Sequence, residues 1–326
     1  MRRFVTILTV LLLLTGCAKQ AESHTRDFFA MNTVMSVTVS GENSEEDSLR
    51  AMQIVQELDK QWSVTNENSA VYQLNATGTA ELSDETAELL RRSLQLKEET
   101  GGAFDPTIYH IVKMWGFTTG EYRVPTDAEL ADALEMHRNS SITLDGNRAA
   151  VSGCAVDLGA VAKGYTAAKI ASELEHADTL NLNLGGNIQL EGTKPDGSPW
   201  RVGIKNPENT EEYLGILELE SGAVVTSGGY ERYFEQDGVR YCHIIDPKTG
   251  RPADKGLISV TIVSEDGFLA DALSTALYVM GLEEASEFWR GRTDFEAVLV
   301  TDAGEIYATE GLQDSFSGCE FQVITR

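Results

Sequence analysis

Cysteine and long apolar runs are both scarce in this chain. Its four cysteines, Cys17, Cys154, Cys242 and Cys319, are too widely and irregularly spaced for a disulfide framework or a zinc site. Beyond residue 16, no apolar stretch approaches the about 20 residues that a membrane-spanning helix requires. We therefore expect the last three cysteines to be small buried residues.

Positive charge is the second deficit. The chain has 26 Lys and Arg residues against 51 Asp and Glu residues, and without Arg2 and Arg3 its net charge is −27. A surface this acidic repels nucleic acid and anionic lipid head groups. The charge therefore argues against nucleic acid as a partner and favours a small molecule or a protein.

The N-terminus has the features of a bacterial lipoprotein signal peptide. Arg2 and Arg3 precede an apolar run over residues 4–14, and Leu14-Thr15-Gly16-Cys17 follows. Small residues before a cysteine form the lipobox, in which the thiol receives a diacylglycerol and the chain is cut just before it. We expect residues 1–16 to be removed, Cys17 to carry the lipid, and residues 17–25 to act as a polar tether. The protein would then lie on the extracytoplasmic face of the bacterial cell membrane; the alternative is an ordinary signal peptide with an incidental cysteine.

Residues 26–326 combine helix and strand patterns without regular alternation. Apolar residues at helical spacing predict helices over 45–60, 86–100, 127–137, 165–174, 268–280 and 282–289. Runs rich in β-forming residues predict a strand or hairpin over 28–40 and a strand end at 156–158. They also predict strands over 179–190, 200–205, 214–219, 224–225, 239–245, 257–263, 297–300 and 306–308. The fold class is therefore α+β, with mixed sheets and packed helices and no visible boundary inside 26–326.

The segment AVDLGAVAKGY, residues 155–165, is typical of an anion site. Asp157 precedes a glycine-bearing turn that opens a helix, and a helix N-terminus presents free N–H groups to a phosphate. Gly159 and Gly164 would let the backbone approach a bulky ligand, and Lys163 would add positive charge. No P-loop motif is present, and a tight connection with a solvated lysine explains the segment equally well.

Asp271 and Thr275 lie on one face of a predicted helix, because they are four residues apart. A carboxylate and a hydroxyl are hard oxygen donors that suit Mg²⁺ or Ca²⁺. Their neighbours are apolar, and a buried carboxylate requires a compensating partner. The alternative is that Asp271 accepts backbone N–H groups near the helix start and that Thr275 fills the core.

Two further segments place polar residues beside glycine or proline. In HIIDPKTGRP, residues 243–252, His243 ends an apolar strand beside a sharp turn, a position suited to acid–base chemistry, although a lone histidine is more often structural. In GGAFDPTI, residues 101–108, a loop surrounds Phe104 and Asp105. Gly185-Gly186 interrupts a strand, for close packing or for the approach of a ligand.

Together these segments resemble the ApbE family of FAD:protein FMN transferases. The resemblance rests on MNT at 31–33, GAFDPTIYHIVKMWGF at 102–117, AVDLGAVAKGY at 155–165, NLNLGGNIQLEG at 181–192, PWRVGIKNP at 199–207, TSGGYERYF at 226–234, HIIDPKTGRP at 243–252 and ADALSTAL at 270–277. Members of this family are often exported lipoproteins, which agrees with the interpretation of Cys17.

The resemblance implies the fold of this family and a Mg²⁺-dependent reaction. FAD would be split at its diphosphate, FMN joined to a threonine of an acceptor protein, and AMP released. The acceptors would be exported flavin-carrying subunits of Rnf- or Nqr-type redox complexes. The matching positions for the metal are Asp271, Thr275, the carbonyl of Ala160 and, beside them, Ser274. Those for FAD are Met31, Ala103, Phe104, Asp105, Asp157, Lys163 and Ile245, and the proton acceptor would be His243, with Asp271 as a second candidate.

The chain departs from the family pattern at three places, one of which is Ser69-Ala70, where the family has a Ser-Glu pair. Asn32 stands where the family usually has glycine. Thr65 stands where an aromatic residue is common, so an aromatic contact with FAD from this position is in doubt, and Trp62 is a candidate to replace it.

Three other functions are consistent with part of the pattern. The sequence Lys248-Thr249-Gly250 resembles a motif of penicillin-binding proteins, but no serine has a lysine three residues later, which excludes that class. Hydrolysis of FAD to FMN and AMP would use the same residues, with water in place of the threonine. A non-catalytic flavin-binding or solute-binding lipoprotein would not need Asp271, Thr275 and His243 together.

Overall fold

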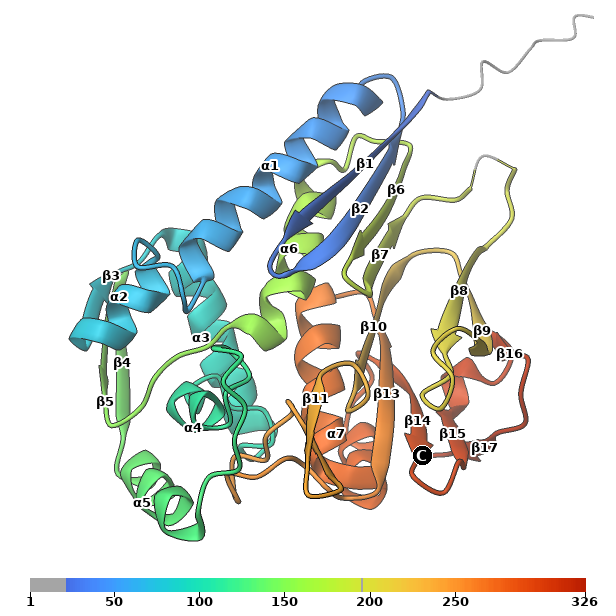
Figure 1. Ribbon diagram of the computed structural model, residues 1–326. Coiled ribbons are helices and arrows are strands. Elements are labelled where there is room, and N and C mark those ends of the chain that lie inside the picture. The colour runs from blue at the N-terminus through green and yellow to red at the C-terminus, as the bar shows by residue number, and fades with distance from the viewer. Residues whose placement is uncertain (1–21, 195) are drawn as a thin grey trace, which may run out of the picture.

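A nine-stranded sheet forms the centre of the molecule in a computed structural model that describes residues 22–194 and 196–326. Its strand order is β1-β2-β6-β7-β10-β13-β14-β15-β17 (Figure 1), and neighbours are antiparallel except β15 and β17. The strands are β1 Ser23–Ala30, β2 Thr33–Ser40, β6 Thr179–Leu184, β7 Asn187–Glu191, β10 Gly222–Gly228, β13 Leu257–Ser264, β14 Glu296–Thr301, β15 Ile306–Thr309 and β17 Gln322–Ile324.

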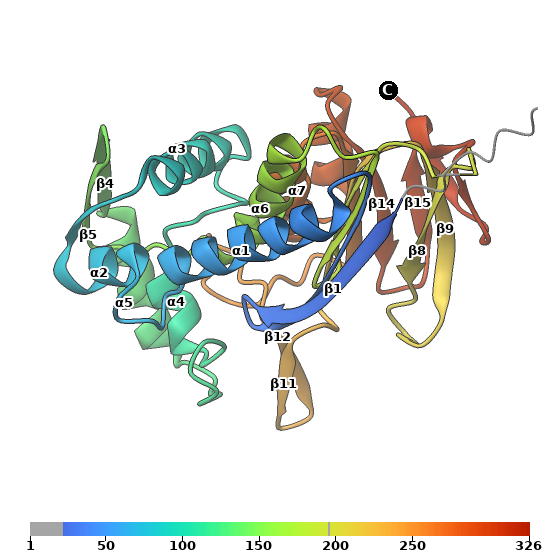
Figure 2. The ribbon, with the colours of Figure 1, turned by 90° about the horizontal axis from the view of Figure 1, so that it is seen from above.

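The two faces of this sheet have different coverings. Three helices pack on one face and enclose the main core: α1 Ser44–Trp62, α6 Gly159–Glu173 and α7 Gly267–Arg290. A second sheet, in the order β16-β9-β8, packs on part of the other face: β8 Trp200–Lys205, β9 Tyr213–Leu219 and β16 Phe316–Ser317. Seen from above, in Figure 2, the helices and this second sheet lie on opposite sides of the central strands.

The alternation along the central strands explains these coverings. Val37 and Leu182 point to the helices and are fully buried, whereas their neighbours Ser36 and Asn183 point to the other face. Residues such as Leu190 and Val224 point to that other face where β8 and β9 cover it. The outer face is therefore apolar under the small sheet and polar beside it.

The remaining elements form a lobe beside the central sheet (Figure 1) and a separate hairpin. The lobe contains α2 Ala70–Thr77, α3 Asp84–Glu99, α4 Tyr109–Met114, α5 Asp127–Arg138 and a sheet in the order β3-β5-β4, with β3 Thr79–Glu81, β4 Ser141–Asp145 and β5 Arg148–Ser152. The hairpin is β11 Tyr233–Gln236 and β12 Val239–Cys242, and η1 Glu310–Leu312 is a single 3₁₀ turn.

The α+β class is confirmed, and so are the longer predicted elements. Thr126 and Glu129 form a capping box at the start of α5, and Gly281, with φ of 78°, breaks α7 where the sequence predicted a stop. The predictions over 28–40 and 179–190 are the hairpins β1–β2 and β6–β7.

Several predicted ends of helices and strands were wrong. Helix α6 begins at Gly159 and not at 165, and residues 156–158 form no strand. Strand β12 ends at Cys242, before His243. Strand β1 begins at Ser23, so residues 23–25, which we assigned to the tether, belong to the sheet. The short elements α2, α4, β3, β4, β5, β11, β16 and β17 were not predicted.

The described residues include no helix that is long and apolar enough to cross a membrane. Cys154, Cys242 and Cys319 are free thiols, of which Cys242 is buried and the other two are half-buried. Cys17 and the signal peptide lie outside the described residues.

Candidate active site

A cavity of about 500 Å³ lies where the hairpin turns of the central sheet meet the first turns of α6 and α7. The loops 103–109 and 243–247 close its other side. Most of the predicted site residues line it: Met31, Ala103, Phe104, Asp105, Asp157, Ala160, Lys163, His243, Ile245, Asp271 and Thr275. Residues that are far apart in the sequence are therefore gathered at one site.

Gly164 sets the distance between α6 and α7. A Cβ atom at this position would lie 2.1 Å from the carbonyl oxygen of Gly267 and 2.6 Å from Cβ of Asp271, so only glycine fits. The Gly164 N–H donates to Oδ2 of Asp271 at 2.9 Å. We expected Gly164 to allow the approach of a ligand; it instead allows two helices to touch, which brings Lys163 and Asp271 into one cavity.

Asp271 is a buried carboxylate with few partners. Its residue is 4% exposed, and Nζ of Lys163 is 3.9 Å from Oδ1. Burial raises the pKa of the Asp271 carboxyl, against the opposing effects of Lys163, of the Gly164 N–H and of the Asn187 side chain. Nδ2 of Asn187, another buried group that lines the cavity, makes no hydrogen bond of normal geometry among the described residues but is close enough to Asp271 to lower that pKa. The cavity wall thus holds a carboxylate whose burial is only partly compensated.

Thr275 faces the cavity one helical turn after Asp271, and its hydroxyl is 3.4 Å from that of Ser227 on β10. Ser274 is fully buried and does not line the cavity. Its hydroxyl donates to the carbonyl of Asp271 at 2.7 Å and lies 2.7 Å from the Ser227 hydroxyl. Ser274 therefore ties α7 to β10 behind the cavity.

The oxygen atoms of this wall fit a hard divalent cation. Asp271 supplies a carboxylate whose burial a cation would compensate, Thr275 supplies a hydroxyl, and Ala160 lines the same cavity. The described residues contain no group of three His, Cys, Asp or Glu side chains that could hold a metal ion. A cation here would therefore depend on hydroxyl, carbonyl and substrate oxygens besides one carboxylate, as Mg²⁺ often does.

Asp157 begins α6 from inside the cavity. Its Oδ1 accepts the Gly159 N–H at 2.8 Å, and its own N–H donates to the carbonyl of Pro106 at 2.8 Å. The recessed position raises the pKa of its carboxyl. Asp157 therefore joins the helix start to the 103–109 loop, and the first turn of α6 points into the cavity with Lys163 one turn later.

Asp105 holds its loop through contacts that the sequence did not reveal. Oδ1 accepts the N–H and hydroxyl of Thr107 at 2.8 and 2.6 Å, and Oδ2 lies 2.8 Å from Nζ of Lys97 and 3.0 Å from Nε2 of His137. Burial alone would raise the pKa of this carboxyl, but the hydrogen bonds from His137, Lys97 and Thr107 outweigh it and lower the pKa. Its carboxylate thus positions Ala103 and Phe104 against the cavity.

His243 reaches the cavity from the loop after β12. Its Nδ1 lies 3.1 Å from the carbonyl oxygen of Arg232, which makes Nδ1 the protonated nitrogen and leaves Nε2 as an acceptor. Burial, together with the positive charges of Arg232 and Lys163, lowers the pKa of His243 to about 4. The imidazole is therefore neutral at pH 7 and able to accept a proton.

This arrangement agrees with the comparison with known families. The model of the ApbE family matches residues 31–299. The chain belongs to the ApbE family. Among ApbE relatives, an FAD:protein FMN transferase of Vibrio cholerae is 35% identical over 298 residues, which cover 87% of this chain and 89% of the relative. One of Treponema pallidum is 34% identical over 284 residues, which cover 80% and 78%.

Solved ApbE structures have the same fold. The apbe protein of Thermotoga maritima superposes with a TM-score of 0.82 at 35% identity and covers 89% of this chain and 98% of its own. The flavin transferase ApbE of Vibrio cholerae gives a TM-score of 0.79 at 28% identity, with coverage of 90% and 99%. The expected ApbE-like fold is therefore confirmed.

The structure explains one departure from the ApbE pattern. Met31 and Asn32 form the two-residue turn between β1 and β2, with φ of 46° and 60°. Both central residues of such a hairpin turn need positive φ, and asparagine tolerates this conformation better than most residues other than glycine. Asn32 thus keeps the backbone that the usual ApbE glycine would allow, and Met31 stays on the cavity wall.

At the departure that involves Thr65, neither this residue nor Trp62 reaches the cavity. Thr65 lies in the loop between α1 and α2, where its hydroxyl contacts that of Ser63 at 3.2 Å, and it does not line the cavity. Trp62 is 5% exposed, donates through Nε1 to the hydroxyl of Thr86 at 3.0 Å, and packs edge-on against Tyr165. Trp62 is therefore a core residue, and the suggestion that it replaces the ApbE aromatic was wrong.

Among the cavity residues that were missed as site residues are the polar side chains of Asn187, Glu231 and Arg232. Asn187 directly follows Gly185-Gly186, which the sequence analysis singled out, and Glu231 and Arg232 follow a second glycine pair, Gly228-Gly229, by two and three residues. Glycine pairs at strand ends were therefore the available signal, and the polar residues that follow them carried the missing chemistry.

Proposed function

We propose that this chain transfers FMN from FAD to a threonine hydroxyl of an acceptor protein. The observation that carries the proposal is the convergence of Lys163, Asp271, Thr275 and a neutral His243 on one cavity of about 500 Å³. The names of the Vibrio cholerae and Treponema pallidum relatives support the same activity.

The first turn of α6 and Lys163 would bind the FAD diphosphate. The N-terminus of a helix offers free N–H groups and positive potential to an anion, and the lysine adds a full charge. Lys163 is only 23% exposed and lies 3.9 Å from Asp271, so its ammonium group is already directed at the cavity.

Mg²⁺ bound by Asp271, Thr275 and the carbonyl of Ala160 would supply charge stabilisation for the diphosphate and the departing AMP. Ser274 would support this group through its hydrogen bonds to Asp271 and Ser227. The proposal includes Mg²⁺ dependence on this basis.

His243 would accept the proton of the threonine hydroxyl at Nε2. A base whose pKa is about 4 is weak, but two of the causes of this low value are the charges of Arg232 and Lys163. The negative diphosphate would offset those charges and raise the pKa of His243 toward the working range. Asp271 is the second candidate for this role, because burial raises the pKa of its carboxyl.

The proposed step is balanced in atoms. The threonine Oγ forms a bond to the phosphorus of the FMN half, and the bond from that phosphorus to the bridging oxygen breaks. The bridging oxygen leaves with AMP, and the hydroxyl proton passes to His243 and then to AMP or solvent. The acceptor gains the mass of FMN less one water.

We further propose that Cys17 carries a lipid and that the acceptor is an exported flavin-carrying subunit of an Rnf- or Nqr-type complex. A lipid anchor would hold the enzyme on the extracytoplasmic face of the membrane, where such subunits lie and where their effective concentration is high. The excess of 51 acidic over 26 basic residues leaves a protein acceptor plausible and disfavours nucleic acid.

The test is incubation of the protein with FAD, Mg²⁺ and an acceptor domain, followed by mass measurement of the acceptor. We expect one FMN per acceptor and an equal amount of AMP, and no label when the acceptor threonine is changed to alanine. Release of FMN and AMP without any labelled acceptor would replace the transferase with a pyrophosphatase. Binding of FAD without AMP release would leave a flavin-binding lipoprotein.

A further inference from the structure

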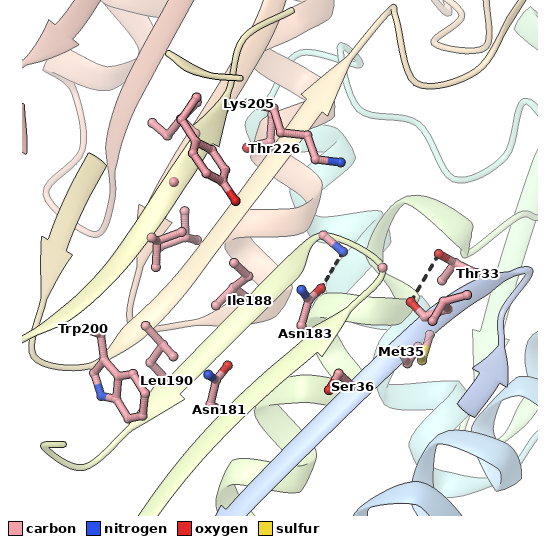
Figure 3. Close-up of a pocket in the computed structure, with 18 of the residues that line it drawn as sticks. Thr33, Met35, Ser36, Asn181, Asn183, Ile188, Leu190, Trp200, Lys205 and Thr226 are labelled. Carbon is pink, nitrogen blue, oxygen red and sulfur yellow. Dashed lines mark hydrogen bonds between the residues drawn. The ribbon is translucent and has the colours of Figure 1, made fainter. Parts of the chain in front are cut away.

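Figure 3 shows a second cavity, of about 580 Å³. It opens directly beside the proposed FAD site. The two cavities share Thr33, Gly185, Thr226 and Glu231. We call the second cavity the β8 groove, because all six residues of β8, 200–205, line it. Its contents would therefore lie next to the reacting diphosphate.

One wall of the β8 groove is an unpaired strand edge. Successive side chains of a strand point to opposite faces, so a cavity that touches all six residues of β8 meets the strand along its edge. In the described part of the chain, β8 has one strand partner, β9. The opposite edge of β8 therefore has main-chain N–H and C=O groups that no other strand uses.

The pairing of β9 shows which groups these are. The N–H of Glu218 donates to the carbonyl of Ser315, away from β8, so Glu218 and its β8 neighbour Arg201 form a non-hydrogen-bonded pair. The alternation along the strand then directs the N–H and C=O groups of Arg201 and Gly203 into the groove. Val202, between them, directs its own groups to Leu217.

The floor of the groove is the polar part of the central sheet that the small sheet leaves uncovered. Ser36, Asn181 and Asn183 project from β2 and β6 into the groove (Figure 3). Oδ1 of Asn183 also accepts the Gly186 N–H at 2.9 Å, which fixes the turn at the border of the two cavities. Amide and hydroxyl groups of this kind bond to peptide side chains and main chain alike.

The two ends of the groove differ. At the far end, Nε1 of Trp200 donates to the carbonyl of Gly192 at 2.7 Å. At the near end are Lys205, Thr226 and Glu231, and the charges of Lys205 and of Lys163 in the FAD site both act on Glu231. A strand bound along β8 would thus lead from Trp200 to the edge of the FAD site.

We infer that the β8 groove binds the acceptor protein as an extended segment, which adds to β8 as a further strand and brings its hydroxyl to the border at Glu231 and Thr226. The inference rests on the proposed transferase function, which needs a polypeptide next to FAD. Main-chain pairing gives affinity for an extended chain of varied sequence, and the side-chain floor adds selectivity. A flavin ring offers no matching row of alternating donors and acceptors.

The sharpest test removes one main-chain donor from the groove. Gly203→Pro lacks the N–H that would bond to the acceptor, and Gly203→Ala is the matched control, because both variants add the same Cβ against the exposed ring of Tyr213. Proline is tolerated in an edge strand when its nitrogen faces outward. Arg201→Pro and Arg201→Ala form a second pair, in which both variants lose the ion pair with Glu218.

The assay uses the full chain loaded with FAD and Mg²⁺, and as probe the extracytoplasmic flavin-carrying domain of an Rnf- or Nqr-type subunit. We expect each proline variant to raise KM for this domain ~10-fold over its alanine control, because one hydrogen bond is lost and the ring blocks the edge. Flavin fluorescence should show unchanged FAD affinity in all four variants.

A second measurement uses the wild-type chain and the same probe with its acceptor threonine changed to alanine, so that no transfer occurs. The Arg201 and Gly203 amides should exchange hydrogen more slowly when the probe is bound, whereas amides of the edge strand β4 should not change. This measurement does not depend on the folding of any groove variant.

The outcomes separate the two proposals. Equal KM values for proline and alanine variants, with unchanged amide exchange, would overturn the groove inference while wild-type transfer persists. Weaker FAD binding in the proline variants alone would make the groove part of the FAD site and would also overturn it. Absence of transfer by the wild type to any acceptor would overturn the proposed function and, with it, the inference.

Discussion

The carboxylate of Asp271 is buried with little positive charge to compensate it. Its Oδ2 accepts the Gly164 N–H at 2.9 Å, and Nζ of Lys163 is 3.9 Å from its Oδ1. An ionised carboxylate in such a place is costly unless a further positive charge is present. The position therefore favours ligand binding over stability, and the two can be separated by mutation.

We expect Asp271→Asn to reduce AMP release ~100-fold or more, since a charge that stabilises the reaction is lost. The melting temperature should change little, because asparagine still offers an oxygen to the Gly164 N–H and the cost of burying a charge disappears. Turnover and thermal unfolding would be measured beside Asp132→Asn, an exposed carboxylate on α5, as a control. Near wild-type turnover of Asp271→Asn at limiting Mg²⁺ would show that the metal assignment is wrong.

His243 should give the protein a defined pH dependence. Its pKa is about 4 in the folded protein and about 6.5 in an unfolded chain, so between these values the unfolded state binds the extra proton. Its contribution to stability is fully present above pH 6.5 and is lost as the pH falls toward 4, by at most ~3 kcal/mol. Urea unfolding at pH 7 and pH 4.5 would measure it, and His243→Gln should remove this part of the difference.

The same residue predicts the acid limb of the activity. With His243 as the base, kcat/KM should rise with pH through about 4 in the free enzyme and then level off. The profile is measured with FAD and acceptor below their KM values. If His243→Gln kept a substantial rate and the same acid limb, the base would be another group, with Asp271 first in line.

At the residue scale, the sequence predicted the residues that carry chemistry but not their supports. Asp157, Lys163, His243 and Asp271 stand in short distinctive segments, and all four line the cavity. The partners of Asp105, Lys97 and His137, come from α3 and α5, and nothing in the sequence marks either as facing a loop. Such contacts depend on how helices pack, which local patterns do not encode.

The contact of α6 with α7 is the element on which the site depends. Lys163 and Asp271 belong to different helices, and the glycine at 164 allows the backbones to touch. Alanine usually stabilises a helix relative to glycine, because it restricts the unfolded chain. A loss of stability at this position would therefore report the contact itself.

We expect Gly164→Ala to destabilise the protein by ~1–3 kcal/mol, since its Cβ would overlap the Gly267 carbonyl and force the helices apart. Activity should fall further than stability explains, because Lys163 and Asp271 would separate. Gly291→Ala at the end of α7 is the control, as its Cβ would meet only an ordinary 3.6 Å contact. If denaturant unfolding gave both variants the wild-type stability, the contact between α6 and α7 would be able to accommodate a Cβ atom at position 164.

The difference between local patterns and long-range contacts explains which helices and strands the sequence predicted. Helices α1, α3, α5 and α7 have long amphipathic or apolar patterns with start and stop signals, and they were found. Strand β3 has three residues and its partner β5 lies almost 70 residues later, so its existence depends on pairing and not on local preference. The early start of α6 was missed because Gly159, a poor helix former, is its first residue.

For the molecule as a whole, the sequence predicts attachment to the membrane through a lipid. The lipobox predicts that Cys17→Ala abolishes lipid attachment and moves the protein from the membrane fraction to the soluble fraction. Labelling cells with a radioactive fatty acid measures this directly. Undiminished label in the variant would show that the lipid is elsewhere, and a Cys154→Ala variant, which keeps the lipobox, serves as the control.

The start of β1 at Ser23 sets the length of the tether between the folded domain and Cys17. Ser23 lies six positions after Cys17, and a fully extended chain spans ~20 Å over that length. A compact chain of about 300 residues has a radius of gyration of a similar size, ~19 Å. With a lipid on Cys17, the short tether would keep the enzyme at the bilayer surface. The enzyme would then encounter acceptors by lateral diffusion in the membrane plane. An acceptor threonine that lies within one protein diameter of the membrane surface would be accessible to the enzyme. A threonine held farther from the membrane would not be.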